Sequence, residues 1–303
     1  MRKTREYRPH LDARKVEAFQ ARLLAWFRKH GRDLPWRRTR DPYKILVSEV
    51  MLQQTQVERV REYYGRFLRE YPTVRDLAAA RAARVQESWD GLGYYARARN
   101  LHAAARMIVR QHGGRFPRHP GELQALPGVG RYTAGAVASF AYGEPAPILD
   151  TNVRRVLART LEGKAFPHLT LTRAEMDLAE ESMPADRAAA NTWNVAVMEL
   201  GALVCVARGP RCEDCPVADL CAWNLAGRPA YDGPPRRGQA WHGTDRQVRG
   251  VILQRLRDAG RPAALGLLVD AAPDTAQVMR CLDSLVADGL VEPLDGERFR
   301  LPA

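Results

Sequence analysis

Four of the five cysteines in this chain fall within 17 residues, and this cluster constrains the fold more than any other feature of the sequence. They are Cys205, Cys212, Cys215 and Cys221. A disulfide framework is typical of small secreted domains, whereas a chain of 303 residues buries enough surface to fold without one. Zinc sites usually pair two C-x2-C knuckles across a longer stretch, but here a single close pair is flanked by single cysteines. Four thiolates in one compact loop suit a [4Fe–4S] cluster, which we predict here, with zinc as the alternative.

The positive charge of the chain is concentrated in its body. Lysine and arginine number 47 against 35 acidic residues, which gives a net charge of +12. Residues 1–40 hold 13 basic and four acidic side chains, whereas residues 246–303 hold eight of each. Because arginine bias can also reflect a GC-rich genome, this distribution is more informative than the total. It indicates a body that binds a polyanion, most simply nucleic acid.

The sequence argues against membrane and secreted classes of protein. No stretch approaches the ~18 uncharged apolar residues of a membrane span, since the most apolar one, residues 195–207, carries Glu199 in its middle. The basic N-terminus lacks the apolar region and cleavage pattern of a secretory signal. We therefore expect a soluble, cytoplasmic, monomeric protein with no membrane partner.

Helical periodicity runs through most of the chain. Residues 12–30 place apolar side chains at helical spacing, with Asp12 as a candidate N-cap and Gly31 just past the C-terminus. Short helical patterns broken by proline and glycine continue from residue 42 to about residue 194, without the alternation of strands. The body is therefore predicted to be all-α.

The tail is predicted to be a separate module after a linker, residues 227–245, that is rich in Gly, Pro and Arg. Residues 246–259 and 276–287 follow helical patterns, and an Asp-Gly turn separates two short strand-like segments after them. This arrangement resembles a winged helix, although its neutral charge fits a packing or interaction module equally well. Cys281 lies there without a cysteine partner and is expected to be a small buried apolar residue.

A glycine-rich turn, residues 126–133, lies between two helical patterns. Gly128 and Gly130 allow the backbone to turn tightly and to expose its N–H groups, and the next helix adds the positive end of its dipole. Arg131 follows directly. This is an anion site, and in a basic protein the expected anion is a DNA phosphate. With its Leu-Pro flank, the turn resembles the helix-hairpin-helix DNA-binding element.

One carboxylate is predicted on the apolar side of a helix. Glu49 shares a helical face with Ile45, Leu46, Leu52 and Gln53. Desolvation raises the pKa of such a carboxyl group, so that it can act as a general acid near neutral pH. The alternative is a buried glutamate paired with an arginine.

A second carboxylate, Asp150, lies 20 residues after Gly130, in the run Ile-Leu-Asp-Thr-Asn-Val. Aspartate, threonine and asparagine are all favoured at helix N-termini, so a helix cap is the alternative to a catalytic role here.

Together these motifs resemble the endonuclease III superfamily of DNA glycosylases. The hairpin, the cluster motif, Leu-Asp-Thr-Asn-Val and Ser-Glu-Val-Met-Leu-Gln-Gln-Thr-Gln-Val occur in the order of that superfamily. The last of these, with residues 89–101, is similar to MutY adenine glycosylases. The resemblance covers about residues 12–226 and implies two α-helical domains with the active site in the cleft between them. We therefore predict five parts of the chain. They are an N-terminal arm and helix (1–40) that pack with the cluster domain, a six-helix barrel (41–150), the cluster domain (151–226), the linker (227–245) and the C-terminal module (246–303).

The resemblance also implies an activity, the removal of adenine mispaired with 8-oxoguanine or guanine in double-stranded DNA. Glu49 is then the acid that protonates N7 of the flipped adenine, and Asp150, beside Asn152, is the counter-charge to the cationic sugar. Tyr132 stands where bifunctional members carry a nucleophilic lysine. We therefore predict base excision without efficient strand cleavage. We also expect the enzyme to associate with the bacterial nucleoid.

The resemblance to this family also implies roles for the remaining site residues. Arg32, Leu34 and Trp36 match residues of the adenine pocket, although Trp36 has a plain core role as its alternative. Gln54 and Tyr94 match residues that enter the duplex, with helix packing as the alternative for Tyr94. The other predicted DNA contacts are Gln53, Thr55, Gly128, Gly130 and Arg131.

Two departures from the MutY pattern are present. Thr151 replaces the usual glycine after the catalytic aspartate, and we expect it to be tolerated. The tail is too short for the Nudix-like domain that recognises 8-oxoguanine in many relatives, which leaves the preference between 8-oxoguanine and guanine open. The alternatives are a thymine or uracil mismatch glycosylase, an endonuclease III-like lyase, which Glu49 and Tyr132 oppose, and a non-catalytic Fe–S DNA-binding regulator, which the neutral tail opposes.

Overall fold

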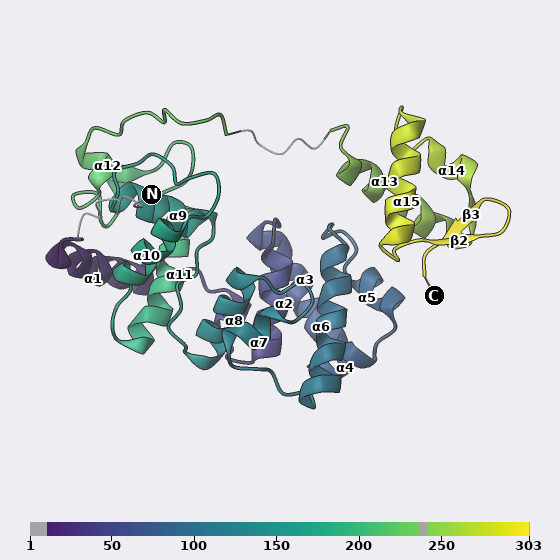
Figure 1. The fold of residues 1–303 in the computed structure, drawn as a ribbon, viewed down its shortest axis with the longest axis horizontal. Coiled ribbons are helices and arrows are strands. Elements are labelled where there is room, and N and C mark those ends of the chain that lie inside the picture. Colours follow the sequence, from purple (N-terminus) through teal and green to yellow (C-terminus); the bar gives the residue numbers. More distant parts are fainter. Residues whose placement is uncertain (1–10, 237–241, 303) are drawn as a thin grey trace, which may run out of the picture. The chain divides into compact units, whose positions relative to one another are not determined.

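The computed structural model describes residues 11–236 and 242–302, and the fold is mainly helical, as the sequence predicts (Figure 1). The first ten residues of the predicted arm and the centre of the predicted linker lie outside the described residues. The helices of the body are α1 (Ala13–His30), α2 (Pro42–Leu52), α3 (Val57–Glu70), α4 (Val74–Ala79), α5 (Ala82–Ser88), α6 (Ala96–His112), α7 (Pro120–Gln124), α8 (Arg131–Tyr142), α9 (Thr151–Thr160), α10 (Arg173–Ser182), α11 (Arg187–Leu203) and α12 (Ala222–Leu225). No helix in the described part of the chain is long and apolar enough to cross a membrane.

The chain divides into two compact units. The first contains residues 1–45, 118–121 and 130–236, and the second contains residues 46–117, 122–129 and 237–303. The first unit has one hydrophobic core, and the C-terminal module within the second unit has another. Each unit is described separately below.

Helices α1, α9 and α11 pack around the core of the first unit. The apolar stripe predicted for α1 is buried there, and the ring of Phe19 lies edge-on to Trp193 at 4.8 Å between centroids. Asp12 caps α1 by accepting a hydrogen bond from the backbone of Arg14, as predicted. Gly31 follows the helix because a Cβ there would lie 2.6 Å from the ring of Phe27.

The second unit contains the helices from α3 to α6. In α3 the buried residues Val60, Tyr64 and Phe67 recur at helical spacing, which explains why this segment forms an amphipathic helix. Trp89 is completely buried against Phe67, with the rings edge-on at 5.8 Å. By contrast, most residues of α2 are buried, including the polar side chains of Ser48 and Glu49.

The C-terminal module, residues 242–302, has the order of a winged helix. Its elements are α13 (Asp245–Ala259), β1 (Ala263–Ala264), α14 (Leu265–Val269), α15 (Thr275–Ala287), β2 (Glu292–Leu294) and β3 (Arg298–Arg300). The strands form an antiparallel sheet in the order β1-β3-β2, with Leu294 opposite Arg298 across the turn. The hairpin and the two longer helices confirm the prediction. β1 and α14 were not predicted, because two and five residues are too few for a periodic signal.

Candidate active site and cluster loop

Glu49 lies near the C-terminal end of α2 and is 6% exposed. Its neighbours Ser48 and Val50 are also buried, so Glu49 lies in a buried stretch of the helix, as the sequence predicts. The helix ends at Leu52, and Gln53 falls in the following turn rather than on the predicted helical face. The physical reason is Gln54, whose φ of +55° cannot continue a right-handed helix.

A buried arginine holds this end of α2. Arg97, on α6, is 9% exposed, and its guanidinium donates hydrogen bonds to two segments of the second unit. Its acceptors are the carbonyls of Val50, Met51 and Gln53 and the hydroxyl of Thr55 on one side, and the carbonyls of Leu92 and Gly93 on the other. Burial lowers the pKa of Arg97 to about 10, which leaves it charged at neutral pH. It joins the turn after α2 to the turn before α6.

Each of these turns carries one residue predicted to enter DNA. Gln54 is exposed and Tyr94 is half-buried, and both have positive φ, +55° and +48°. They are two of the four non-glycine residues with positive φ in the described part of the chain. Such backbone strain costs roughly 1–3 kcal/mol per residue and concentrates at functional sites. The roles of Gln54 and Tyr94 in DNA binding stay predictions.

The glycine turn before α8 is exposed at both of its predicted glycines. Gly128 has φ of +74°, and a Cβ there would lie 2.7 Å from the Cβ of Asn100, so both conformation and space require glycine. Gly130 is the N-cap residue of α8, and Arg131 is exposed in the first turn. The helix N-terminus is thus open to an anion, as the sequence predicts.

Asp150 is the N-cap of α9. One carboxylate oxygen accepts hydrogen bonds from the backbone of Asn152 at 2.9 Å and of Val153 at 2.7 Å, and the other accepts from the Asn152 side chain. Burial raises the pKa of Asp150, while these hydrogen bonds and the charge of Arg155 lower it, and the result is a pKa above the ordinary value. Thr151 is helical without a positive φ, so nothing in the backbone requires glycine there.

Arg155 extends this turn toward the cysteine loop. Its guanidinium donates to the side chain of Asn152 and to the carbonyls of Gly201 and Cys205, each at 2.8 Å. A role for this arginine was not predicted, although a charged residue on the apolar side of α9 is a usable sequence signal for one. Tyr132, in the first turn of α8, places its hydroxyl 3.9 Å from the sulfur of Met198.

Arg32, one of the predicted adenine-pocket residues, forms an ion pair with a buried carboxylate, and this pair was not predicted. Leu34 and Trp36 are 2% and 8% exposed, next to the short 3-10 turn Pro35–Arg37. The guanidinium of Arg32 binds Glu199 of α11 with two hydrogen bonds of 2.9 Å, and Arg37 adds a third at 2.8 Å. Burial raises the pKa of Glu199, but the two arginines outweigh it and hold the pKa at about 2. The only sequence signal for this ion pair is that Glu199 is a charged residue inside an apolar run.

All four clustered cysteines line one pocket. Arg159, 2% exposed, borders it with its guanidinium 3.4 Å from the sulfur of Cys205, and its charge would offset that of bound thiolates. Four soft sulfur donors around one pocket fit an iron–sulfur cluster by their chemistry.

Comparisons with known proteins agree with this geometry. Residues 47–180 match the family of HhH-GPD superfamily base excision DNA repair proteins, and residues 205–221 match the iron–sulfur binding domain of endonuclease III. An adenine DNA glycosylase of Mycobacterium tuberculosis is 48% identical over 292 residues, which cover 92% of each chain.

Solved structures show the same fold. A thermostable thymine-DNA glycosylase matches with a TM-score of 0.65 and 32% identity, over 70% of this chain and 98% of that one. A non-covalent endonuclease III–DNA complex matches with a TM-score of 0.61 and 25% identity, over 72% of this chain and 99% of that one.

Proposed function

This chain belongs to the adenine DNA glycosylase family of the HhH-GPD superfamily, and on that premise we propose that it excises adenine paired with 8-oxoguanine or guanine in duplex DNA. It is a DNA-binding enzyme of base excision repair with a [4Fe–4S] cluster. The observation that carries the proposal is the Arg97 anchor. It holds the end of the helix with buried Glu49 against the turn with Tyr94.

Glu49 is the general acid in this proposal. The adenine leaves the base stack, and Glu49 donates a proton to N7 while the bond between N9 and C1′ of the sugar breaks. The bonding electrons leave with the base, which the proton makes a better leaving group. Water adds to C1′ and gives up a proton. A positioned general acid contributes about 10²–10⁴-fold to such a rate.

Asp150 is the negative charge that faces the cationic sugar. The three hydrogen bonds that cap α9 also fix this carboxylate in place, so the helix-cap role and the catalytic role are compatible. Asn152 orients it through its side-chain amide. Tyr132 has no amine to form a Schiff base, so the product is an abasic site in an uncut strand.

The other residues that we propose to contact DNA come from both units. We assign Gln54 and Tyr94 to the duplex beside the mispair, with Gln53 and Thr55 in the turn that holds Gln54. Gly128, Gly130 and Arg131 bind a backbone phosphate at the N-terminus of α8. Arg32, Leu34 and Trp36 line the adenine pocket. The enzyme acts as a monomer on the nucleoid, where its duplex substrate lies.

The cysteine loop supports this site from the first unit. We assign Cys205, Cys212, Cys215 and Cys221 as the ligands, because all four line the same cavity. The bound cluster would cross-link the loop, and Arg155 joins the carbonyl of Cys205 to the side chain of Asn152. The chain thus connects the cluster loop to the turn that holds Asp150.

A thymine or uracil mismatch glycosylase is the second candidate, supported by the similarity to the thymine-DNA glycosylase structure. The test uses labelled duplexes with A opposite 8-oxoguanine, A:G, T:G and U:G, each read with and without alkali. Cleavage of the A strand only after alkali supports the proposal. Excision confined to T:G or U:G would replace it with the second candidate, and strand cleavage without alkali would contradict the role of Tyr132.

A further inference from the structure

The C-terminal module contacts the segment that carries Tyr94, and both lie in the second compact unit. Two ion pairs join them, one at each end of residues 90–99. Asp90 pairs with Arg257 of α13 at 2.9 Å, and Arg99 pairs with Asp288 at the end of α15 at 3.1 Å. The module therefore contacts the segment on both sides of Tyr94.

Between these ion pairs, Tyr95 packs against the hydrophobic core of the module. Its hydroxyl donates a 2.8 Å hydrogen bond to Asp90, and the guanidinium of Arg257 lies 5.6 Å from its ring centroid. Burial raises the pKa of Tyr95 to about 12. Tyr95 is thus an apolar anchor next in sequence to Tyr94.

Tyr94 itself lies between two arginines. The guanidinium of Arg246, at the start of α13, is 3.9 Å from the centroid of the Tyr94 ring, and that of Arg97 is 5.4 Å away. Cation–π contacts at such distances contribute about 0.5–2 kcal/mol. They would limit the freedom of a ring whose backbone is already strained.

Charged side chains of the module take part in this contact. Asp288 binds Arg249 of the module at 2.6 Å as well as Arg99 of the body. Burial raises the pKa of Asp288, but hydrogen bonds from Arg249 and Arg99 outweigh it and lower the pKa below its ordinary value. Eight basic and eight acidic residues cancel in the tail. Two of its arginines, Arg246 and Arg257, contact the body of the protein, and with no net charge the module adds no net attraction for DNA.

We propose that the C-terminal module is a positioning element for the Tyr94 segment, with Arg246, Arg257 and Asp288 as the positioning residues. The module holds residues 90–99 so that Tyr94 meets the duplex in one orientation. The inference rests on the role assigned to Tyr94 under the proposed function. It gives a positioning role to the C-terminal module.

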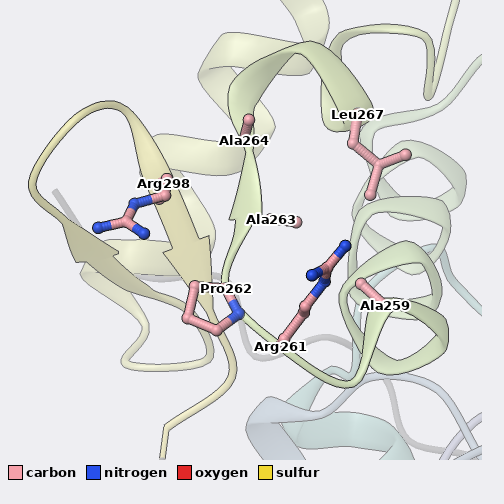
Figure 2. A pocket seen from close by; sticks show the side chains of 7 residues that line it. All are labelled: Ala259, Arg261, Pro262, Ala263, Ala264, Leu267 and Arg298. Carbon is pink, nitrogen blue, oxygen red and sulfur yellow. The ribbon is translucent and has the colours of Figure 1, made fainter.

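The test compares full-length variants by two measurements, hydrogen exchange of residues 91–99 without DNA and the single-turnover rate of adenine excision. The variants are Arg246→Ala, Arg257→Asp, Asp90→Arg and the double variant Asp90→Arg/Arg257→Asp, which restores the ion pair with its charges reversed. Arg261→Ala is the matched control, because it removes one exposed arginine of the same module, beside the pocket in Figure 2.

We expect Arg246→Ala and Arg257→Asp to speed exchange of residues 91–99 and to slow excision by roughly ten-fold, since small misplacements near the reacting groups are costly. Duplex affinity should stay unchanged, the double variant should recover both properties, and Arg261→Ala should match the wild type. Unchanged exchange in both single variants, or a double variant no better than Arg257→Asp, would overturn the inference. A wild type that excises no adenine would instead refute the proposed function, while the exchange measurement still reports on the contact.

Discussion

The carboxylate of Glu199 receives both arms of the Arg32 guanidinium, with Nε and Nη2 each 2.9 Å from a carboxylate oxygen. The backbone N–H of Arg32 donates a further hydrogen bond of 2.7 Å to the same group. The pair ties the loop after α1 to the middle of α11, 167 residues away. It thereby fixes the loop that carries Leu34 and Trp36.

This pair makes stability depend on acid pH. The pKa of Glu199 is about 2 in the folded protein against 4.5 for the free group, so its contribution is complete above pH 4.5 and disappears as the pH falls toward 2. The shift corresponds to about 3 kcal/mol. Glu199→Gln should lower the free energy of unfolding by roughly 3–5 kcal/mol at pH 7, because two arginines lose their partner. Denaturant titrations from pH 3 to pH 7 check this, and equal pH slopes for variant and wild type would contradict it.

Glu49→Gln tests the general acid. The variant keeps the size of the buried side chain, so it should fold, retain the cluster absorbance and bind the A:8-oxoguanine duplex. It should lose excision by at least about 10²-fold, because the amide has no acidic proton to donate. Single-turnover assays measure this loss, and normal activity would remove Glu49 from the mechanism.

Asp150→Asn separates helix capping from catalysis. Asparagine caps helices as well as aspartate does, so the variant should fold with α9 intact. Only the ionised carboxylate stabilises the cationic sugar, and the pKa of Asp150 is raised. Excision by the wild type should therefore fall with acidification at a higher pH than an ordinary aspartate would give. A rate–pH profile checks this, and the variant should be slow at every pH and lack that acid limb.

Arg97→Lys tests the anchor between the turn that carries Gln54 and the turn that carries Tyr94. A lysine cannot reproduce the fork that reaches six acceptors, so buried carbonyls lose their partners. We expect a loss of at least about 2 kcal/mol in unfolding free energy and slower excision. Arg106→Lys, an exposed change on the same helix, is the control. Equal stability of the two variants would show that Arg97 does not hold these turns.

Cys212→Ser tests the cluster. The variant should lose the visible absorbance and the iron of the cluster and should bind DNA more weakly, because the cavity loses one of four thiolates. Cys281→Ser, in the core of the C-terminal module, should keep both signals. Iron analysis with zinc analysis distinguishes the metals, and one zinc without iron in the wild type would overturn the assignment.

Local sequence determined much of this protein. The stripe of α1 and the cap at Asp12 depend on residues a few positions apart, and both were predicted correctly. The N-cap at Asp150, which the sequence offered as the alternative to a catalytic role, is equally local. The winged-helix order was also predicted from short-range patterns, except for elements too short to show periodicity.

Tertiary structure alone decided how these pieces meet. Arg97 reaches carbonyls more than 40 residues away, Arg32 meets Glu199 across 167 residues, and Arg99 meets Asp288 across 189. A buried charge needs a partner, but the sequence does not say which distant one the fold provides. The sequence therefore determined which residues are proposed to carry the chemistry. The fold decided which arginines hold them in place, because desolvated ion pairs form only where packing brings their elements together.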